Sequence, residues 1–197
     1  MEKGTEDVVY NPVNRERITF LDTHRSTGGK RTRFRVEVQP GGGVETHYHR
    51  SYDERIEATQ GIVDVEVDGE RRRLSPGEYV MIRTGQSHRF WNASNGVMHF
   101  EVLVEPASEG YEMMLRGVHG IARDGGSNKT GIPKDLRAIA VLAKWGDTRL
   151  VGAMRLLVPV LGVLHWLARR AKLDADLYDK YGESQGQFEE SSLGQGG

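Results

Sequence analysis

The stretch G-G-G-V-E-T-H-Y-H-R-S-Y-D-E-R-I-E-A-T-Q-G, residues 41–61, decides the fold. It places His47 and His49 two residues apart in a segment that is typical of a β-strand, so both imidazoles leave the same face. Glu54 follows five residues after the second histidine. A carboxylate that arrives across the next turn would complete three ligands around a divalent metal ion. The stretch therefore predicts a metal site.

Alternating apolar and polar residues on either side of this stretch predict many short β-strands. In residues 32–39, Phe34, Val36 and Val38 share one face, and Pro40 ends the pattern. Asp68 and Gly69 are a strong hairpin signal. Short strands joined by Gly, Pro, Asn and Ser turns indicate an antiparallel sandwich or barrel of the jelly-roll type. The predicted strands cover residues 17–22, 32–39, 44–49, 54–60, 63–67, 70–74, 78–82, 88–92 and 97–105.

Two spaced motifs carry a resemblance to a known family. With fifteen residues between them, they are Gly41-x5-His47-x-His49-x4-Glu54-x6-Gly61 and Gly77-x5-Arg83-x-Gly85-x2-His88-x3-Asn92. Together they resemble the two motifs of the cupin superfamily, with nine of its ten signature positions filled, over about residues 30–105. The departure is Arg83, where the family has proline. Either this arginine faces solvent, or it anchors an anionic group of a substrate.

The resemblance implies a single-domain cupin: a mostly β, jelly-roll barrel or sandwich that holds a metal ion. The implied ligands are His47, His49, Glu54 and His88. Three imidazoles and one carboxylate suit Fe, Mn, Ni, Co or Zn, whereas Ca and Mg prefer more oxygen ligands. Proteins that resemble this chain commonly pair, so the resemblance also implies a homodimer.

The walls of the ligand pocket depend on which strand face is inside. Phe90 shares the parity of His88, so it is expected to line the pocket. If the polar faces of these strands point inward, Arg35, Glu37, His99 and Glu101 would surround the metal and select a polar substrate. Otherwise these four side chains are solvated. His119, in a predicted helix, is expected to face solvent. The predicted substrate-binding residues are Arg83, Arg35, Glu37, His99, Glu101 and Phe90.

Composition excludes several classes of protein. A net charge of −1 gives no indication of nucleic acid as a partner, and the absence of cysteine excludes disulfides and thiolate chemistry. The N-terminal residues are acidic and contain no apolar run, so they do not resemble a secretory signal. We therefore expect a cytoplasmic protein whose partner is a small molecule.

Beyond Pro106 the pattern changes from strands to helices. Helices are expected over residues 109–123, 133–145 and 150–173, the last with a weak continuation to residue 181. Residues 149–172 contain five basic and no acidic residues around an apolar run, which could pack in a dimer interface, cover the barrel or contact a membrane peripherally. The expected organisation is a flexible N-terminal arm (1–16), the cupin barrel (17–106), a helical C-terminal extension (107–181) and a disordered tail (182–197).

These observations leave different functions open. The first is a metal-dependent enzyme acting on a small molecule, either a dioxygenase or an isomerase or lyase. The second is a module that binds a metal or a small molecule without turnover. The third is an accessory protein that associates with a membrane through the apolar, basic helix.

Overall fold

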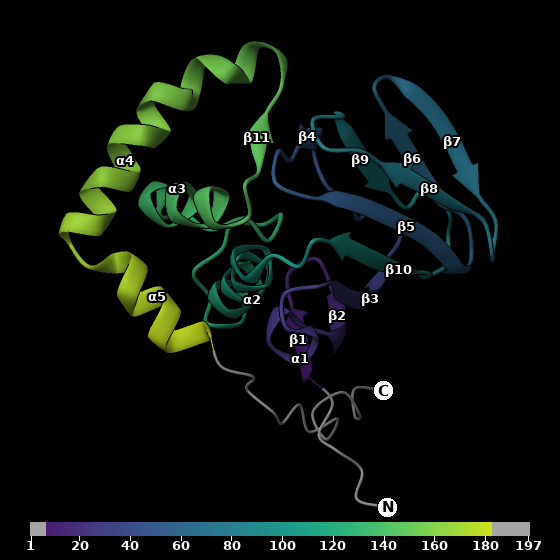
Figure 1. Ribbon diagram of the computed structural model, residues 1–197, viewed down its shortest axis with the longest axis horizontal. Helices are drawn as coiled ribbons and strands as arrows, with labels where there is room; N and C mark the ends of the chain where they lie inside the picture. Colours follow the sequence, from purple (N-terminus) through teal and green to yellow (C-terminus); the bar gives the residue numbers. More distant parts are fainter. Residues whose placement is uncertain (1–6, 183–197) are drawn as a thin grey trace, which may run out of the picture.

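The computed structural model describes residues 7–182 and contains two antiparallel sheets beside a group of helices (Figure 1). The six-stranded sheet has the order β1-β2-β3-β10-β5-β8, and the five-stranded sheet has the order β11-β4-β9-β6-β7. The strands of the first sheet are β1 (Asp7–Asn11), β2 (Glu16–Asp22), β3 (Thr32–Val38), β5 (Asp53–Gln60), β8 (Tyr79–Ile82) and β10 (Met98–Glu105). Those of the second are β4 (His47–Tyr48), β6 (Val63–Val67), β7 (Glu70–Leu74), β9 (His88–Trp91) and β11 (Arg149–Leu150).

The two sheets enclose one apolar core. On β3, Phe34, Val36 and Val38 are buried, and on β6, Val63 and Val65 face them from the other sheet within the same cluster. The alternation of two residues per repeat puts every second side chain of β3, β5 and β10 inside. These observations confirm the predicted jelly-roll fold with helices at the C-terminal side.

Two turns show why glycine is needed at particular positions. Asp68 and Gly69 both have positive φ, 49° and 84°, which is the geometry of a tight hairpin between β6 and β7. Gly43 lies against β9, where a Cβ atom would be 2.5 Å from the carbonyl oxygen of Phe90. A side chain at residue 43 would therefore push the loop before His47 away from the sheet.

The helices form a layer with a core of its own. After the short α1 (His24–Thr27), they are α2 (Glu109–Arg123), α3 (Leu136–Trp145), the 3-10 helix η1 (Gly152–Leu157), α4 (Val158–Arg170) and α5 (Leu173–Tyr181). Their core contains Val141, Leu142, Ala168 and Leu177. Helix α2 lies between this core and the barrel, because its Met114 packs against both clusters (Figure 1).

The chain returns from the helices to the barrel at β11. Arg149 pairs with Tyr48 and Leu150 pairs with His47, so β11 extends the five-stranded sheet beside β4. The helical extension is therefore hydrogen-bonded to the strand that carries the first histidine of the predicted site.

Two expectations about organisation change. Residues 7–16, predicted as part of a flexible arm, contain β1, which pairs with β2 along its whole length. The long helix predicted over residues 150–173 is instead the pair η1 and α4, since Pro159 is accommodated only in the first turn of a helix. The predicted disordered tail lies outside the described residues from residue 183 onward.

Candidate metal centre

Three histidines from two adjacent strands converge inside the barrel. His47 on β4 lies directly opposite His88 on β9, and His49 follows β4 by one residue. One ring nitrogen from each of the three lies within 4.8 Å of the others. Glu54, on β5 of the other sheet, brings its Oε2 atom to 3.1 Å from Nε2 of His88 and 3.9 Å from Nε2 of His49. The structure thus brings the four predicted ligands together.

Hydrogen bonds at Nδ1 fix the tautomer of each histidine ring. Nδ1 of His47 lies 2.8 Å from the carbonyl oxygen of Glu45, and Nδ1 of His88 lies 3.2 Å from that of Gln86. A carbonyl oxygen only accepts, so each Nδ1 carries a hydrogen and donates it. In the neutral rings the lone pair is then on Nε2.

Tyr52 fixes the third ring in the same way. Its hydroxyl donates its single hydrogen to the carbonyl oxygen of Gly146 at 2.7 Å, so it must accept from Nδ1 of His49 at 2.8 Å. Nε2 of His49 is consequently an acceptor. Nε2 of His47 and Nε2 of His49 are therefore acceptors, whereas Nε2 of His88 lies 3.1 Å from Oε2 of Glu54 and would give up its hydrogen to a bound cation. The orientation of all three rings is set by partners outside the cluster, as in characterised metal sites.

The pKa values of His47, His49 and Glu54 favour the forms that bind a metal ion at neutral pH. Burial lowers the pKa of His47 to about 3 and also lowers the pKa of His49. Burial opposes ionisation of Glu54, but the hydrogen bond and charge of His88 outweigh it, and the pKa of Glu54 falls to about 2. Burial likewise opposes protonation of His88, whose pKa is nevertheless raised by the Glu54 carboxylate. A carboxylate and its neighbouring imidazoles thus form a compact, anion-containing cluster.

The cluster fits a cation because its central atoms lack other partners. Nε2 of His49 is buried and has no hydrogen-bond partner among the described residues, and Oε2 of Glu54 has only Nε2 of His88, at 3.1 Å, beside it. A buried acceptor without a partner costs free energy, which a bound cation would recover. Three nitrogen atoms and one carboxylate match the ligand preferences of Mn, Fe, Co, Ni and Zn.

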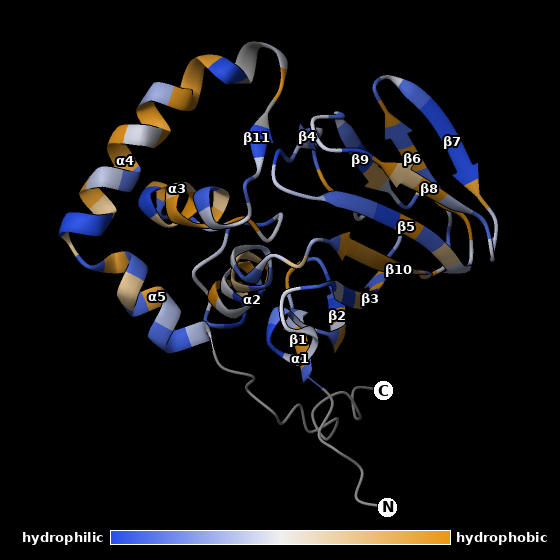
Figure 2. Cartoon of the chain, in the orientation of Figure 1, coloured by the Kyte–Doolittle hydropathy of each residue, from blue (hydrophilic) through white to orange (hydrophobic). Residues whose placement is uncertain are grey.

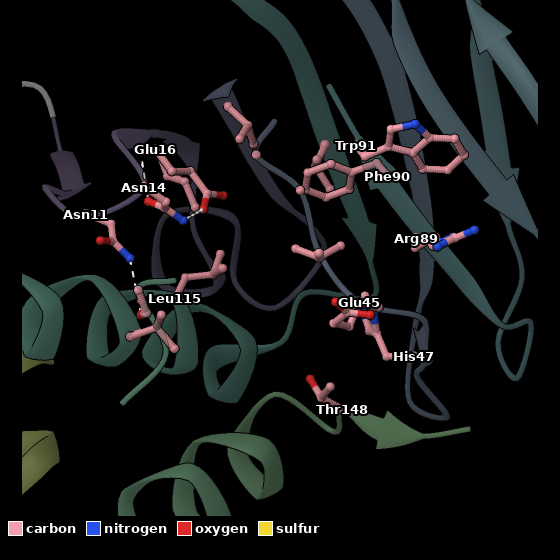
Figure 3. A pocket seen from close by; sticks show the side chains of 18 of the residues that line it. Asn11, Asn14, Glu16, Glu45, His47, Arg89, Phe90, Trp91, Leu115 and Thr148 are labelled. Carbon is pink, nitrogen blue, oxygen red and sulfur yellow. Dashed lines mark hydrogen bonds between the residues drawn. The ribbon is translucent and has the colours of Figure 1, made fainter. Parts of the chain in front are cut away.

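The cluster lies at one end of a cavity of about 600 Å³. Figure 3 shows Asn11, Asn14 and Glu16 on one side of this cavity, and Glu45 and His47 on the other. Apolar side chains from the barrel and from α2 lie between the two ends. They include Ile18, Phe34, Val36, Phe90, Phe100, Val102, Met114, Leu115 and Val118. The cavity is therefore apolar in the middle and polar at both ends.

Tyr111 of α2 stands between the apolar wall and the metal-binding cluster. Its hydroxyl donates to Oε1 of Glu54 at 3.5 Å, and the residue lines the cavity. Burial raises the pKa of Tyr111 well above its usual value of 10, so the hydroxyl keeps its hydrogen. It is a fixed hydrogen-bond donor beside the predicted ligands.

Of the predicted substrate-binding residues, only Phe90 lines the cavity. Glu37 and His99 face each other across β3 and β10, as do Arg35 and Glu101, and all four are on the outer face of the sheet. Arg35 pairs there with Glu101 at 3.2 Å. The polar face is outside because burying these charges would cost more free energy than pairing them in water.

Arg83 also lies outside the cavity. Its Nη1 atom donates to Oδ2 of Asp53 at 2.7 Å, and its side chain is 66% exposed. The same aspartate accepts from the backbone N–H of Thr84. The arginine therefore stabilises the turn at which the family pattern has proline, and it is not placed to contact a ligand.

His119 is buried, contrary to the expectation that it faces solvent. Only 3% of it is exposed, and it lines the cavity. Its Nδ1 donates to the carbonyl oxygen of Leu115 at 2.8 Å, while Nε2 is buried without a partner among the described residues. Helical periodicity alone could have indicated this, because His119 follows Tyr111 and Leu115 on one face of α2.

Tyr52, Tyr111 and Gly146 are the remaining contributors that sequence reasoning missed. Tyr52 has a local signal, since a tyrosine three residues after His49 lies inside the first motif. Tyr111 and the Gly146 carbonyl have none, because they reach Glu54 and Tyr52 across 57 and 94 residues of chain.

Comparisons with known proteins agree with this geometry. A family model described as a cupin domain matches residues 34–105. Over 60 residues the chain is 37% identical to the tetracenomycin polyketide synthase protein TcmJ of Streptomyces glaucescens. This match covers 30% of the chain and 40% of the relative, so the chain spans less than half the length of that protein.

Several solved structures are similar over about half of the chain. A predicted oxalate decarboxylase from Thermotoga maritima is 18% identical, with a TM-score of 0.47 over 53% of this chain and 94% of that one. KdgF from Halomonas sp. is 22% identical, with a TM-score of 0.42 over 46% and 80%. The polyketide cyclase RemF from Streptomyces resistomycificus is 21% identical, with a TM-score of 0.42 over 46% and 64%.

The matched segment contains His47, His49, Glu54 and His88, and it runs from β3 to the end of β10. Both motifs belong to it, and so do strands β4 to β10 of the two sheets. Residues 34–105 of this chain are therefore a cupin domain.

Proposed function

We propose that this protein is a metal-dependent enzyme that acts on a small molecule bound in the cavity. The metal ion would be held by His47, His49, His88 and Glu54. The observation that carries the proposal is the common orientation of the three imidazoles. Each Nδ1 is occupied by an acceptor, and each Nε2 is directed to the cluster that Glu54 completes.

The donor set favours a transition metal over calcium or magnesium, because neutral nitrogen ligands outnumber the carboxylate. When bound, such an ion would polarise a substrate oxygen and, if it is redox active, would support oxidation by dioxygen. Four protein ligands on a six-coordinate ion would leave two positions for a substrate with two neighbouring oxygen atoms.

The cavity favours a flat, largely apolar substrate with polar groups at both ends. Phe34, Phe90 and Phe100 offer aromatic surface in its middle, and a cavity of about 600 Å³ is of the usual size for a drug-sized ligand. The identity shared with a polyketide synthase protein supports polyketides as the class to test first, and the three phenylalanines of the cavity favour aromatic members of that class.

The chain's own residues would orient such a substrate and control its protons. Glu54, with its pKa lowered to about 2, is an anion and does not donate a proton at neutral pH. Tyr111 donates its one hydroxyl hydrogen to Oε1 of Glu54, so it would hold this carboxylate in place as a ligand beside the bound substrate. The apolar wall would exclude water from this end of the cavity.

The test combines metal analysis with a turnover screen. Protein purified without an affinity tag should contain close to one transition metal per chain, and His47→Ala with His49→Ala should remove both the metal and any turnover of aromatic polyketides. Oxygen consumption with product formation would assign a dioxygenase, and turnover without oxygen would assign an isomerase or lyase. A metal-free wild-type protein, or metal and ligand binding without turnover, would overturn the enzyme proposal.

A further inference from the structure

The segment of η1 and α4 carries more exposed large apolar side chains than any other part of residues 7–182. Twelve such side chains are exposed in this part of the chain, and seven of them lie between residues 156 and 167. Figure 2 shows hydrophobic residues along α4. Leu156 is 81% exposed and Val163 is 58% exposed. We define the α4 surface by these seven residues, of which the first two belong to η1: Leu156, Leu157, Val158, Val160, Val163, Trp166 and Leu167. A contiguous patch of this kind marks an interaction site.

The opposite side of α4 is already occupied. Ala168 is fully buried in the helical core, where it packs with Val141 and Leu142 of α3. The α4 surface therefore cannot turn inward without breaking this core. Figure 1 shows α4 as the outermost helix of the layer, on the far side of α3 from the barrel, so no other described element covers it.

Cations lie at both ends of the α4 surface. Arg155 precedes it, and Arg169, Arg170 and Lys172 follow it, while residues 149–172 contain no acidic residue. The guanidinium group of Arg170 lies 4.8 Å from the ring centre of Trp166, which keeps this charge beside the apolar patch. A tryptophan next to an arginine is typical of side chains at the boundary between lipid headgroups and acyl chains.

This distribution of charge argues against a second copy of the chain as the occupant. In an antiparallel contact between two α4 surfaces, Arg155 of each copy would meet Arg169 and Arg170 of the other. In a parallel contact, each arginine would meet its own equivalent. Arg169 has an acidic neighbour within its own copy, Asp174 at 3.5 Å. Neither arrangement offers an acidic residue of residues 149–172 to these cations, and like charges at an interface are unfavourable.

We propose that the α4 surface docks the protein onto an anionic lipid bilayer. Its apolar side chains would enter the boundary between headgroups and acyl chains, and its four cations would meet lipid phosphates. With 13 residues α4 is about 20 Å long, which is shorter than the hydrocarbon core of a bilayer. No helix among residues 7–182 is long and apolar enough to cross a membrane, so α4 would lie in the plane of the surface.

The test is binding of the full-length chain to vesicles, measured by flotation. We expect binding to vesicles of phosphatidylcholine with phosphatidylglycerol, weak binding to phosphatidylcholine alone, and a decrease in binding as salt is raised. Arg169→Gln with Arg170→Gln should weaken binding roughly 30-fold, since each basic residue near such a surface contributes about 1 kcal/mol. The matched control is Arg72→Gln with Arg73→Gln on β7, which should leave binding unchanged.

A second pair of variants tests the apolar part. Leu156→Ser with Val163→Ser should weaken binding at least 10-fold, whereas Leu136→Ser, at a position 60% exposed on α3, should not. All variants should keep the metal content and helical circular dichroism of the wild type, which separates loss of docking from loss of fold. The proposal is overturned if the wild type does not bind anionic vesicles, or if the α4 variants bind as it does. It is equally overturned if the wild type is a dimer that Leu156→Ser with Val163→Ser dissociates.

Discussion

The hydroxyl of Tyr52 links the metal-binding cluster to the helical extension through two hydrogen bonds. It accepts from Nδ1 of His49 and donates to the carbonyl oxygen of Gly146. Tyr52→Phe keeps the ring but removes both bonds, so His49 loses the partner that fixes its tautomer. We expect the affinity for Zn²⁺ to fall about 10- to 100-fold, measured by competition with a chromogenic chelator.

The control for this substitution is Tyr79→Phe. Tyr79 is 54% exposed on β8, and its ring stacks under Arg55, which phenylalanine would preserve. Zinc affinity should be unchanged in that variant. An affinity of Tyr52→Phe within twofold of the wild type would show that the hydroxyl does not orient His49.

His119 gives a second test at this scale, because its Nε2 is buried without a partner. Leucine removes that unsatisfied acceptor, and the Leu115 carbonyl that Nδ1 contacts still receives its helical hydrogen bond. We expect the free energy of unfolding of His119→Leu to stay the same or rise by about 1 kcal/mol in urea titrations. Binding of a hydroxylated aromatic ligand should weaken about 10-fold in calorimetric titrations.

The control here is Met114→Leu, which changes an apolar side chain of the same cavity wall. Met114→Leu should change the free energy of unfolding only slightly, and it should weaken ligand binding less than His119→Leu does. If His119→Leu is strongly destabilised and binds ligand normally, the imidazole has a structural role only.

At the scale of elements, β1 and β11 were not predicted, but the other strands could be predicted from the sequence to within a few residues. Alternation in segments such as residues 32–38 leaves little freedom, and Asp68 with Gly69 fixes a tight turn. Alternation separates the two faces of a strand but does not say which face meets the cavity. The sequence therefore left open whether Arg35 and Glu101 line the cavity. The structure resolves the question through their pairing on the outer face.

The contribution of the extension could not be predicted, because it depends on contacts across long stretches of chain. Nothing near residue 146 in the sequence indicates that a backbone carbonyl there would meet Tyr52. The pairing of β11 with β4 involves two residues of each strand, which is too short to leave a sequence pattern. Proximity of α2 to Glu54 likewise appears only when the barrel mouth is formed.

Hydrogen bonds of Asp147 anchor the segment before β11 to the loop that follows β4. Its carboxylate accepts from the backbone N–H of Arg50, from Oγ of Ser51 and from Nε of Arg149. Burial opposes ionisation, but these bonds outweigh it, so the pKa of Asp147 lies below the ordinary value of 3.8. A lowered folded pKa means that the carboxylate stabilises the fold above the unfolded pKa. This contribution is lost as pH falls through the folded value.

Asp147→Asn isolates this contribution, because asparagine tolerates the positive φ of 46° at this position. We expect a loss of about 1–2 kcal/mol in the free energy of unfolding at pH 7, where the carboxylate is ionised. The difference from the wild type should shrink as pH falls below about 4, in urea titrations at a series of pH values. Asp179→Asn, at an exposed position on α5, should show neither effect, and a pH-independent difference at residue 147 would contradict the assignment.

On the scale of the whole molecule, the barrel and the helical extension act as one structure. Arg116 of α2 forms a bidentate pair with Asp7 of β1, and Tyr111 of the same helix belongs to the core of the barrel. Together with β11 these contacts join the two units at both the cavity wall and the ligand strand. The extension therefore completes the site, in addition to carrying the α4 surface.

This unity predicts how a metal ion changes the stability of the protein. An ion that binds only the folded chain stabilises it by about 2.7 kcal/mol at a free concentration 100 times the Kd. For a chain of this size the melting temperature should rise by about 5–10 °C. Circular dichroism at 222 nm reports mainly the extension, since α2, α3, α4 and α5 contain most of the helical residues. Tryptophan fluorescence reports the barrel through Trp91 in the variant Trp145→Phe with Trp166→Phe, because the other two of the three tryptophans lie in α3 and α4.

The melting temperatures from both signals should rise together when Zn²⁺ is added to chelator-treated protein. The reason is that the Gly146 carbonyl and β11 couple the helices to the ligand strand. His47→Ala with His49→Ala is the control, and neither signal should shift in it. If the metal raised the barrel transition while the helical transition stayed in place, the extension would be an independent unit. The hydrogen bond from Tyr52 to Gly146 would then contribute little to the stability of the metal centre.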